Sequence, residues 1–564
     1  MKAFLFRCLC LAIILHGMTL RSQDQALLTL SGATAWEELD EEELERLEGL
    51  RSAPVRINTA SQARLLSCGL FSRFQVLSLL DYRAHSGDIL SLHELGLIDG
   101  FSPETARMLA PFVSFYSAAR AGALPKDRTQ HEILGRWEGH NGLWGYAAKY
   151  RTAQEGRWMA SVTARSSAKE ALQVPDTWSF NGTFPFRKRP GKWMIGDYNA
   201  RFGQGLALWN GFSLGGLTAA ESFARHPSGL TPAWSLSPDG PLRGVAADLS
   251  FRQMTVSAAG IFPGLRARMD GDPKAAVSAA GALNVAWTGR RAEGSLTALL
   301  APASSDMGSK IAADLRWTPG AVGFFAEGAW DLTSQSLAAV GGLIWSPAYQ
   351  HKYALALRHY PARFHSALTG GIRAGSRCSG EQGLAAGIRL PWLRFSADYV
   401  RFTEKQQAQT KLLCILPLTI KERFSVTPRM QLRWKSGQRR EDYRLEAGYS
   451  GSPWQAKVRT DVVRSAGTAW QCYAEGGVKS DAFTLYLRTG IFKVDHWDDR
   501  IYVYERDAPG CFNVPAYYGR GYRASLTGSV RWRRHKLYLR IAGIRYVSDK
   551  PGRCECRIQY NWSR

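Results

Sequence analysis

The chain has 564 residues and a formal net charge of +24, from 72 Lys and Arg against 48 Asp and Glu. This length exceeds one ordinary globular domain. The basic residues are spread over the C-terminal region, so the charge by itself does not single out a nucleic-acid-binding protein. The nine cysteines are scattered, which excludes a dense disulfide framework.

The first residues have the pattern of a secretory signal. Met1-Lys2 gives a short positive start, the run from Ala3 to Leu20 is mostly apolar, and a polar stretch begins at Ser22-Gln23. No later segment offers about 20 consecutive apolar residues. We therefore expect residues 1–23 to be a cleaved signal peptide, and the exported chain to be either a soluble protein or a barrel that spans the membrane with strands.

Residues 24–55 are rich in glutamate. Apolar side chains recur there at near-helical spacing, at Trp36, Leu39, Leu44, Leu47 and Leu50. This pattern predicts an acidic helix on the surface of the protein.

Residues 56–117 are expected to form a compact helical domain. Apolar residues recur at helical spacing before a break at residues 85–88. Ser102 and Pro103 then form a helix start, since serine caps free backbone amides and proline fits the first turn. A linker over 118–130 follows this domain.

Residues 131–564 have a different pattern, in which apolar and polar side chains alternate over segments of about 10 residues. In the segment 523–533, for example, Leu526 and Val530 belong to one face and Arg523 and Ser525 to the other. Turn residues such as Ser436-Gly437 separate the segments. The predicted fold class is mainly β: a large antiparallel up-and-down transmembrane β-barrel of about 24 strands with a small N-terminal all-α domain.

The 19 tryptophans lie mostly near the ends of candidate strands, as expected for the aromatic girdles of a membrane barrel. The chain ends on a candidate strand, Arg553 to Trp562. A soluble sandwich, propeller or β-helix is the alternative, but the repeat that a propeller needs is not found. The long stretch 204–242 is rich in Gly, Pro and Ser and is a candidate to fold into the barrel.

The helical domain resembles the double helix-hairpin-helix module of ComEA-type competence DNA receptors. The matching residues are Ile57-Asn58-Thr59-Ala60, Asp81-Tyr82-Arg83, Ser91-Leu92, Glu94-Leu95 and Asp99-Gly100-Phe101. The resemblance implies that the backbone amides of each hairpin bind a DNA phosphate or another partner. The implied contact residues are Leu70, Phe71, Ser72 and Arg73 in the first hairpin and Gly100, Phe101, Ser102 and Arg107 in the second.

The first hairpin departs from that family, because Leu70-Phe71-Ser72 lacks both glycines of the usual Gly-hydrophobic-Gly pattern, and the second keeps only Gly100. The whole architecture is similar to large Bacteroidota proteins known by their helix-hairpin-helix domain. The segment from Gly196 to Phe212 resembles a stretch at the start of their β-rich region. This resemblance brings no established activity with it.

No nucleotide-binding loop, nucleophile elbow or zinc-protease motif occurs in the sequence. We therefore expect no enzyme, no catalytic residue, no cofactor and no metal site. The leading hypothesis is an outer-membrane barrel with its helical module in the periplasm, acting in transport or in docking a periplasmic protein. It would contact outer-membrane lipid and lipopolysaccharide. DNA binding or uptake is the alternative, and a surface enzyme is a remote one.

Overall fold

The computed structural model describes residues 28–563, except for 29, 32, 40–45, 48–49, 52–53, 61, 63–64, 66–67, 116–128, 155–156, 170–173, 188, 212–216, 218–219, 235–239, 252, 263–278, 303–304, 349–350, 421–422, 452, 481 and 549. The predicted signal peptide and nearly all of the predicted linker lie outside the described residues. Within the described part of the chain, no helix is both long and apolar enough to cross a membrane.

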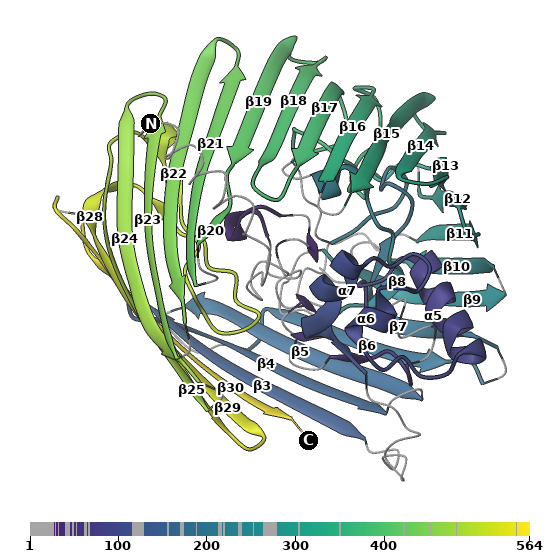
Figure 1. Ribbon diagram of the computed structural model, residues 1–564, viewed down its shortest axis with the longest axis horizontal. Helices are drawn as coiled ribbons and strands as arrows, with labels where there is room; N and C mark the ends of the chain where they lie inside the picture. The colour runs from purple at the N-terminus through teal and green to yellow at the C-terminus, as the bar shows by residue number, and fades with distance from the viewer. Residues whose placement is uncertain are drawn as a thin grey trace, which may run out of the picture.

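A closed barrel of 24 antiparallel strands makes up most of the protein (Figure 1). Its strands are β3 (Gln130–His140), β4 (Leu143–Gln154), β5 (Trp158–Lys169), β6 (Thr177–Pro185), β7 (Gly191–Arg201), β9 (Leu242–Phe251), β10 (Met254–Ile261), β11 (Ala280–Thr288), β12 (Ala292–Leu300), β13 (Lys310–Trp317), β14 (Val322–Asp331), β15 (Ser336–Ala348), β16 (His351–Tyr360), β17 (Glu381–Arg389), β18 (Arg394–Phe402), β19 (Gln407–Ile415), β21 (Phe424–Lys435), β22 (Gln438–Ser450), β23 (Trp454–Arg464), β24 (Thr468–Lys479), β25 (Phe483–Val494), β28 (Gly519–Trp532), β29 (His535–Tyr546) and β30 (Arg553–Ser563). The terminal strand β30 pairs with β3 and closes the ring.

Two short strands extend this ring. The strand β8 (Gly229–Pro232) pairs with the end of β7, and β20 (Leu418–Ile420) continues β19 alongside β21. The predicted barrel and its approximate strand number are confirmed.

The alternation of side chains gives each strand one face toward membrane and one toward the lumen. In β25 and β28, Leu487 and Val530 point outward and are more than half exposed, whereas Arg488 and Arg523 are 5% exposed. Consecutive side chains of a strand point to opposite faces, so a sequence alternating apolar and polar residues covers the outside of the barrel with apolar groups.

The two ends of the barrel differ in the length of their connections. At the end where β3 begins and β30 finishes, strands are joined by turns of a few residues, such as 289–291 and 533–534. At the opposite end, several connections are long: 202–241, 262–279, 361–380 and 495–518. We call these the short-turn end and the long-loop end. In outer-membrane barrels the short turns face the periplasm and the long loops face outward.

Exposed tryptophans form a belt near each end of the barrel. Near the short-turn end these are Trp193, Trp287, Trp317, Trp345, Trp454 and Trp532, and near the long-loop end Trp144, Trp178, Trp330 and Trp470. Several stack on an aromatic neighbour; the rings of Trp317 and Phe324, for example, lie 5.5 Å apart. The predicted girdles are therefore present, and they mark where the apolar band meets water.

The N-terminal residues 46–115 form a separate helical module, shown within the outline of the barrel in Figure 1. Its helices include α5 (Arg73–His85), α6 (Leu92–Leu95), α7 (Pro103–Leu109) and the short 3-10 helix η2 (Ala110–Phe112). The strands β1 (Val55–Arg56) and β2 (Val113–Ser114) pair in parallel and close the module. Its buried core includes Ile57, Leu65, Leu79, Leu95 and Leu109.

This module is attached to the short-turn end of the barrel. Glu104 in α7 forms an ion pair with Arg389, the last residue of β17, at 2.8 Å. Asp99 approaches Arg290, in the turn between β11 and β12, at 3.0 Å. Both arginines lie beside short turns, so these two contacts place α7 and the turn before it at that rim.

The acidic segment differs from the predicted surface helix. Residues 28, 30, 31, 46, 47, 50 and 51 are helical, and between the two groups lie the extended positions Ala35 and Leu39 and the 3-10 helix η1 (Trp36–Glu38). Glu37 and Glu38 are not solvated but contact the inner wall of the barrel. The expectation of a solvated helix was wrong, because ion pairs with distant strands determine where these carboxylates lie. Such long-range contacts leave no trace in the local periodicity of the sequence.

Candidate functional site in the barrel lumen

Arginines line one side of the lumen. Because directly paired residues on neighbouring strands share a face, register places one arginine after another on the inner wall. Arg429 on β21 is paired with Arg444 on β22, for example, and Arg540 on β29 with Arg557 on β30. The eight residues that we call the arginine wall are Arg136, Arg429, Arg444, Arg459, Arg488, Arg523, Arg540 and Arg557.

Part of this positive charge is neutralised by carboxylates on the same strands. Asp461 on β23 accepts from the Nε atoms of Arg444 and Arg459, at 2.7 Å each. Glu475 on β24 accepts from Arg488 Nε at 2.8 Å. These pairs hold the guanidinium groups in fixed orientations in a region of low exposure, where an ion pair is screened little by solvent.

The connection 495–518, which we call the inner loop, folds back into the lumen from the long-loop end. It contains the short hairpin of β26 (Ile501–Tyr502) and β27 (Ala516–Tyr517). Its Glu505 has no exposed side-chain surface and binds Arg523 and Arg540 of the arginine wall. Burial alone would raise the pKa of Glu505, but the bonds from these two arginines more than offset it and lower the pKa. The glutamate therefore stays charged and fixes the loop to the wall.

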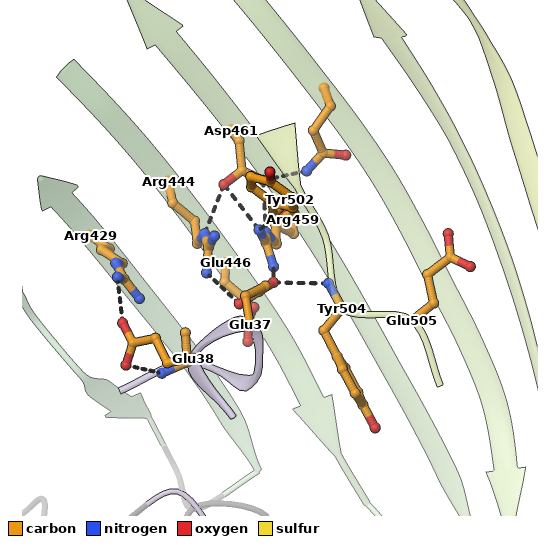
Figure 2. A network of polar contacts seen from close by, with 12 residues as sticks. Glu37, Glu38, Arg429, Arg444, Glu446, Arg459, Asp461, Tyr502, Tyr504 and Glu505 are labelled. Carbon is orange, nitrogen blue, oxygen red and sulfur yellow. Dashed lines mark hydrogen bonds and ion pairs between the residues drawn. The ribbon is translucent and has the colours of Figure 1, made fainter. Parts of the chain in front are cut away.

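Residues 33–39, which we call the docking turn, enter the lumen as the second insertion (Figure 2). Glu37 binds Arg459 and, at 3.3 Å, Arg444, while Glu38 binds Arg429 at 2.9 Å. Glu38 also accepts from the backbone amide of Thr34 at 2.7 Å and so stabilises the turn itself. Burial would raise the pKa of Glu37, but Arg444 and Arg459 reverse this and hold it well below its usual range.

The docking turn and the inner loop contact each other inside the barrel. The Trp36 ring stacks on the Tyr504 ring with centroids 5.0 Å apart, and Tyr504 donates its backbone N–H to Glu37 at 3.0 Å. Phe512 packs against the apolar cluster of Leu28, Ala33 and Leu39. A segment that precedes the helical module in the chain thus meets a loop from the long-loop end, and together they fill part of the lumen.

The connection 202–241, which we call the lining loop, covers the opposite wall by apolar packing. Leu206, Leu217 and Phe223 are buried against inward-facing residues of β13 to β17, such as Phe325. This confirms the prediction that the stretch 204–242 folds into the barrel.

The part of the lining loop around His226 lies near the short-turn end of the barrel. His226 Nδ1 lies 3.2 Å from Arg316, next to the last residue of β13.

The hairpin residues predicted as contacts are brought together in two similar turns. Ser72 caps α5 and Ser102 caps α7, each by accepting an amide of the first turn. The rings of Phe71 and Phe101 meet edge to face, with centroids 6.1 Å apart. Leu70 and Gly100 occupy the equivalent positions just before them, Arg73 begins α5, and Arg107 is an exposed residue of α7.

The sequence reasoning missed the residues that build the lumen site. The sequence did indicate that these arginines face inward, because they alternate with outward-facing apolar residues in the C-terminal strands. Alternation does not show which arginines are neighbours on adjacent strands. Nothing in the local sequence marks Glu37, Glu38 or Glu505, because each acquires its partners from strands far away in the chain.

No protein-family model and no curated protein matches the chain. Among solved structures, it is similar to the P pilus usher (PapC) translocation pore, with 9% identity, 77% of this chain and 99% of that chain covered, and a TM-score of 0.37. It is also similar to an E. coli P pilus tip assembly intermediate of PapC, PapD, PapK and PapG, with 10% identity, coverage of 79% and 63%, and a TM-score of 0.48. Pseudomonas aeruginosa OccK3 (OpdO) follows, with 8% identity, coverage of 77% and 95%, and a TM-score of 0.30.

Proposed function

We propose that this protein is an outer-membrane transport barrel whose lumen is closed by its own chain at rest, with the helical module in the periplasm. The observation that carries the proposal is the meeting of the docking turn and the inner loop on the arginine wall. A barrel of 24 strands encloses a lumen much wider than its wall side chains can fill. Insertions from both ends are therefore what restricts passage.

Two features support this orientation and location. The outer surface is an apolar band between two belts of tryptophan, which fits lipid and lipopolysaccharide. The short turns lie at the end that carries the module, as periplasmic turns do. The module is then the part of the chain that a periplasmic protein partner can reach.

The lining loop and the docking turn are held in the lumen by different forces. This difference indicates which of the two can move. The lining loop is packed through apolar side chains and belongs to the core of the wall. The docking turn is held chiefly by Glu37 and Glu38 on arginines, contacts that an incoming anion can replace one for one. We infer that release of the docking turn opens the lumen, and that the exposed arginines then favour anionic cargo.

Conductance in planar bilayers tests the proposal. The purified full-length protein is expected to show small or rare openings, and the double variant Glu37→Gln, Glu38→Gln is expected to show larger, anion-selective ones. Asp81→Asn, which removes an exposed carboxylate of α5, is the matched control and should leave conductance unchanged. If the double variant conducts no better than the unmodified protein, the docking turn is not the gate.

Location is tested separately. An epitope inserted after Gly87, in an exposed turn of the module, should be unreachable by antibody on intact cells and reachable once the outer membrane is permeabilised. Labelling of intact cells would reverse the orientation. Absence of the protein from the outer-membrane fraction would reject the location.

A further inference from the structure

The docking turn occupies a site whose three arginine donors all belong to the barrel wall. Arg429, Arg444 and Arg459 lie on three successive strands, and register places Arg429 directly opposite Arg444 on the same face. The three side chains converge on two consecutive carboxylates, of which Glu37 binds two arginines and Glu38 binds the third (Figure 2). The wall itself supplies all of these donors.

The charges of the wall around this site do not balance when the turn is removed. Asp461 is shared between Arg444 and Arg459, and it remains in place in either state. The nearby Glu446 forms its own ion pair with Lys457, at 2.8 Å. Without Glu37 and Glu38, Arg444 and Arg459 would keep only Asp461, and Arg429 would lose its ion pair with Glu38. This is an unfavourable arrangement for charges of low exposure. As long as Glu37 and Glu38 are charged, the turn is therefore expected to leave only when another anion replaces it.

The remaining contacts favour a peptide as that anion. The Tyr504 ring forms a flat surface on which Trp36 stacks with an interplanar angle of 18°. The backbone N–H of Tyr504 adds a directed donor to the Glu37 carboxylate. The site thus holds an aromatic side chain and two carboxylates at consecutive positions of a peptide backbone.

We propose that Arg429, Arg444, Arg459 and Tyr504 form a binding site for an acidic peptide segment, with an aromatic residue followed by two carboxylates, and that the docking turn is its internal occupant. Entry of an external acidic peptide and release of the docking turn are then one exchange. This inference names the cargo or trigger of the transport role proposed above and rests on it.

Direct binding in detergent provides the test. The probe is a fluorescein-labelled peptide with the sequence of residues 33–39, Ala-Thr-Ala-Trp-Glu-Glu-Leu, followed by anisotropy. Full-length protein carrying Glu37→Gln and Glu38→Gln should bind it at least 10-fold more tightly than the unmodified protein, whose own turn competes. A peptide with Gln in place of both Glu should bind at least 10-fold more weakly.

Variants of the wall locate the site. In the Glu37→Gln, Glu38→Gln background, Arg429→Gln should weaken peptide binding at least 10-fold. Arg557→Gln, on the same wall but paired with Glu138 and Asp507, is the matched control and should not. Unchanged heat-modifiability on gels would show that each variant still forms the barrel.

The outcomes separate the site from the transport role. Equal binding of the Gln peptide, no effect of Arg429→Gln, or displacement by citrate as effective as by the acidic peptide would each overturn the peptide site. Peptide binding without any conductance would reject transport and leave the site standing. Conductance in the double variant without peptide binding would reject the site and leave transport standing.

Discussion

The carboxylate of Glu37 accepts a hydrogen bond from the backbone N–H of Tyr504, which lies 467 positions later in the chain. The contact joins the docking turn, which precedes the helical module in the chain, to a loop that begins at the long-loop end. Arg459 binds the same carboxylate from the wall. One side chain thus connects the docking turn, the inner loop and the barrel wall, and this arrangement has measurable consequences.

Acidification should release the docking turn. The docked Glu37 has a pKa well below the ordinary 4.5 of the released residue, so docking is fully stabilised above that value and weakens as the pH falls through the docked pKa. Conductance should therefore stay low from about pH 8 to about pH 5 and rise only in more acidic solution. The Glu37→Gln, Glu38→Gln variant should lack this rise. A rise centred near neutral pH would point to a different titrating group.

Replacing Glu505 by Gln should destabilise the inner loop strongly. The change removes the charge that Arg523 and Arg540 share, and breaking a buried pair on one side typically costs about 3–5 kcal/mol. The shift in the urea midpoint of unfolding, measured on the full-length protein in detergent, would give this loss of stability. Asp495→Asn is the control, because its ion pair with Arg520 is solvent-exposed and is expected to contribute little to stability. Equal shifts for the two variants would contradict a structural role for Glu505.

Gly100→Ala should loosen the helical module more than Gly87→Ala does. Both glycines have a positive φ, at +84° and +89°, where an L side chain costs roughly 1–2 kcal/mol. A Cβ at Gly100 would also lie 2.8 Å from the Phe74 ring, whereas nothing lies within 4 Å at Gly87. Limited proteolysis of residues 46–115 within the full-length protein should be faster for the first variant. Matching rates would mean that the ring contact has no effect.

The free-energy cost of an arginine on the lipid-facing surface should depend on how deep in the membrane it lies. Leu487 lies in the middle of β25 and is 57% exposed on the outer face, so Leu487→Arg should cost about 2–4 kcal/mol and reduce assembly into the outer membrane. Phe483 begins the same strand at the interface, and Phe483→Arg should cost about 0–1 kcal/mol. Folding yield into vesicles of defined lipid gives the comparison. Equal yields would argue that this face does not meet lipid.

The barrel could be predicted from the sequence, because the patterns that indicate it are local. The alternation of side chains within a strand such as β28 indicates which of them face lipid. Ser436 and Gly437, which both have a positive φ, indicate the position of a tight hairpin turn. The caps at Ser72 and Ser102 were likewise local features of the module. Such patterns need no knowledge of distant residues, which is why the strand number and the two faces could be predicted.

The segments that fill the lumen could not be predicted from local patterns, because they are placed by contacts between distant parts of the chain. The register between β21, β22 and β23 determines that Arg429, Arg444 and Arg459 converge, and no single strand contains that information. The path of the chain brings Glu37 and Glu38 to them from an acidic segment whose periodicity indicated a surface helix. Charged groups pair according to geometry and burial rather than sequence distance, so the candidate site became visible only once the strands were closed into a ring.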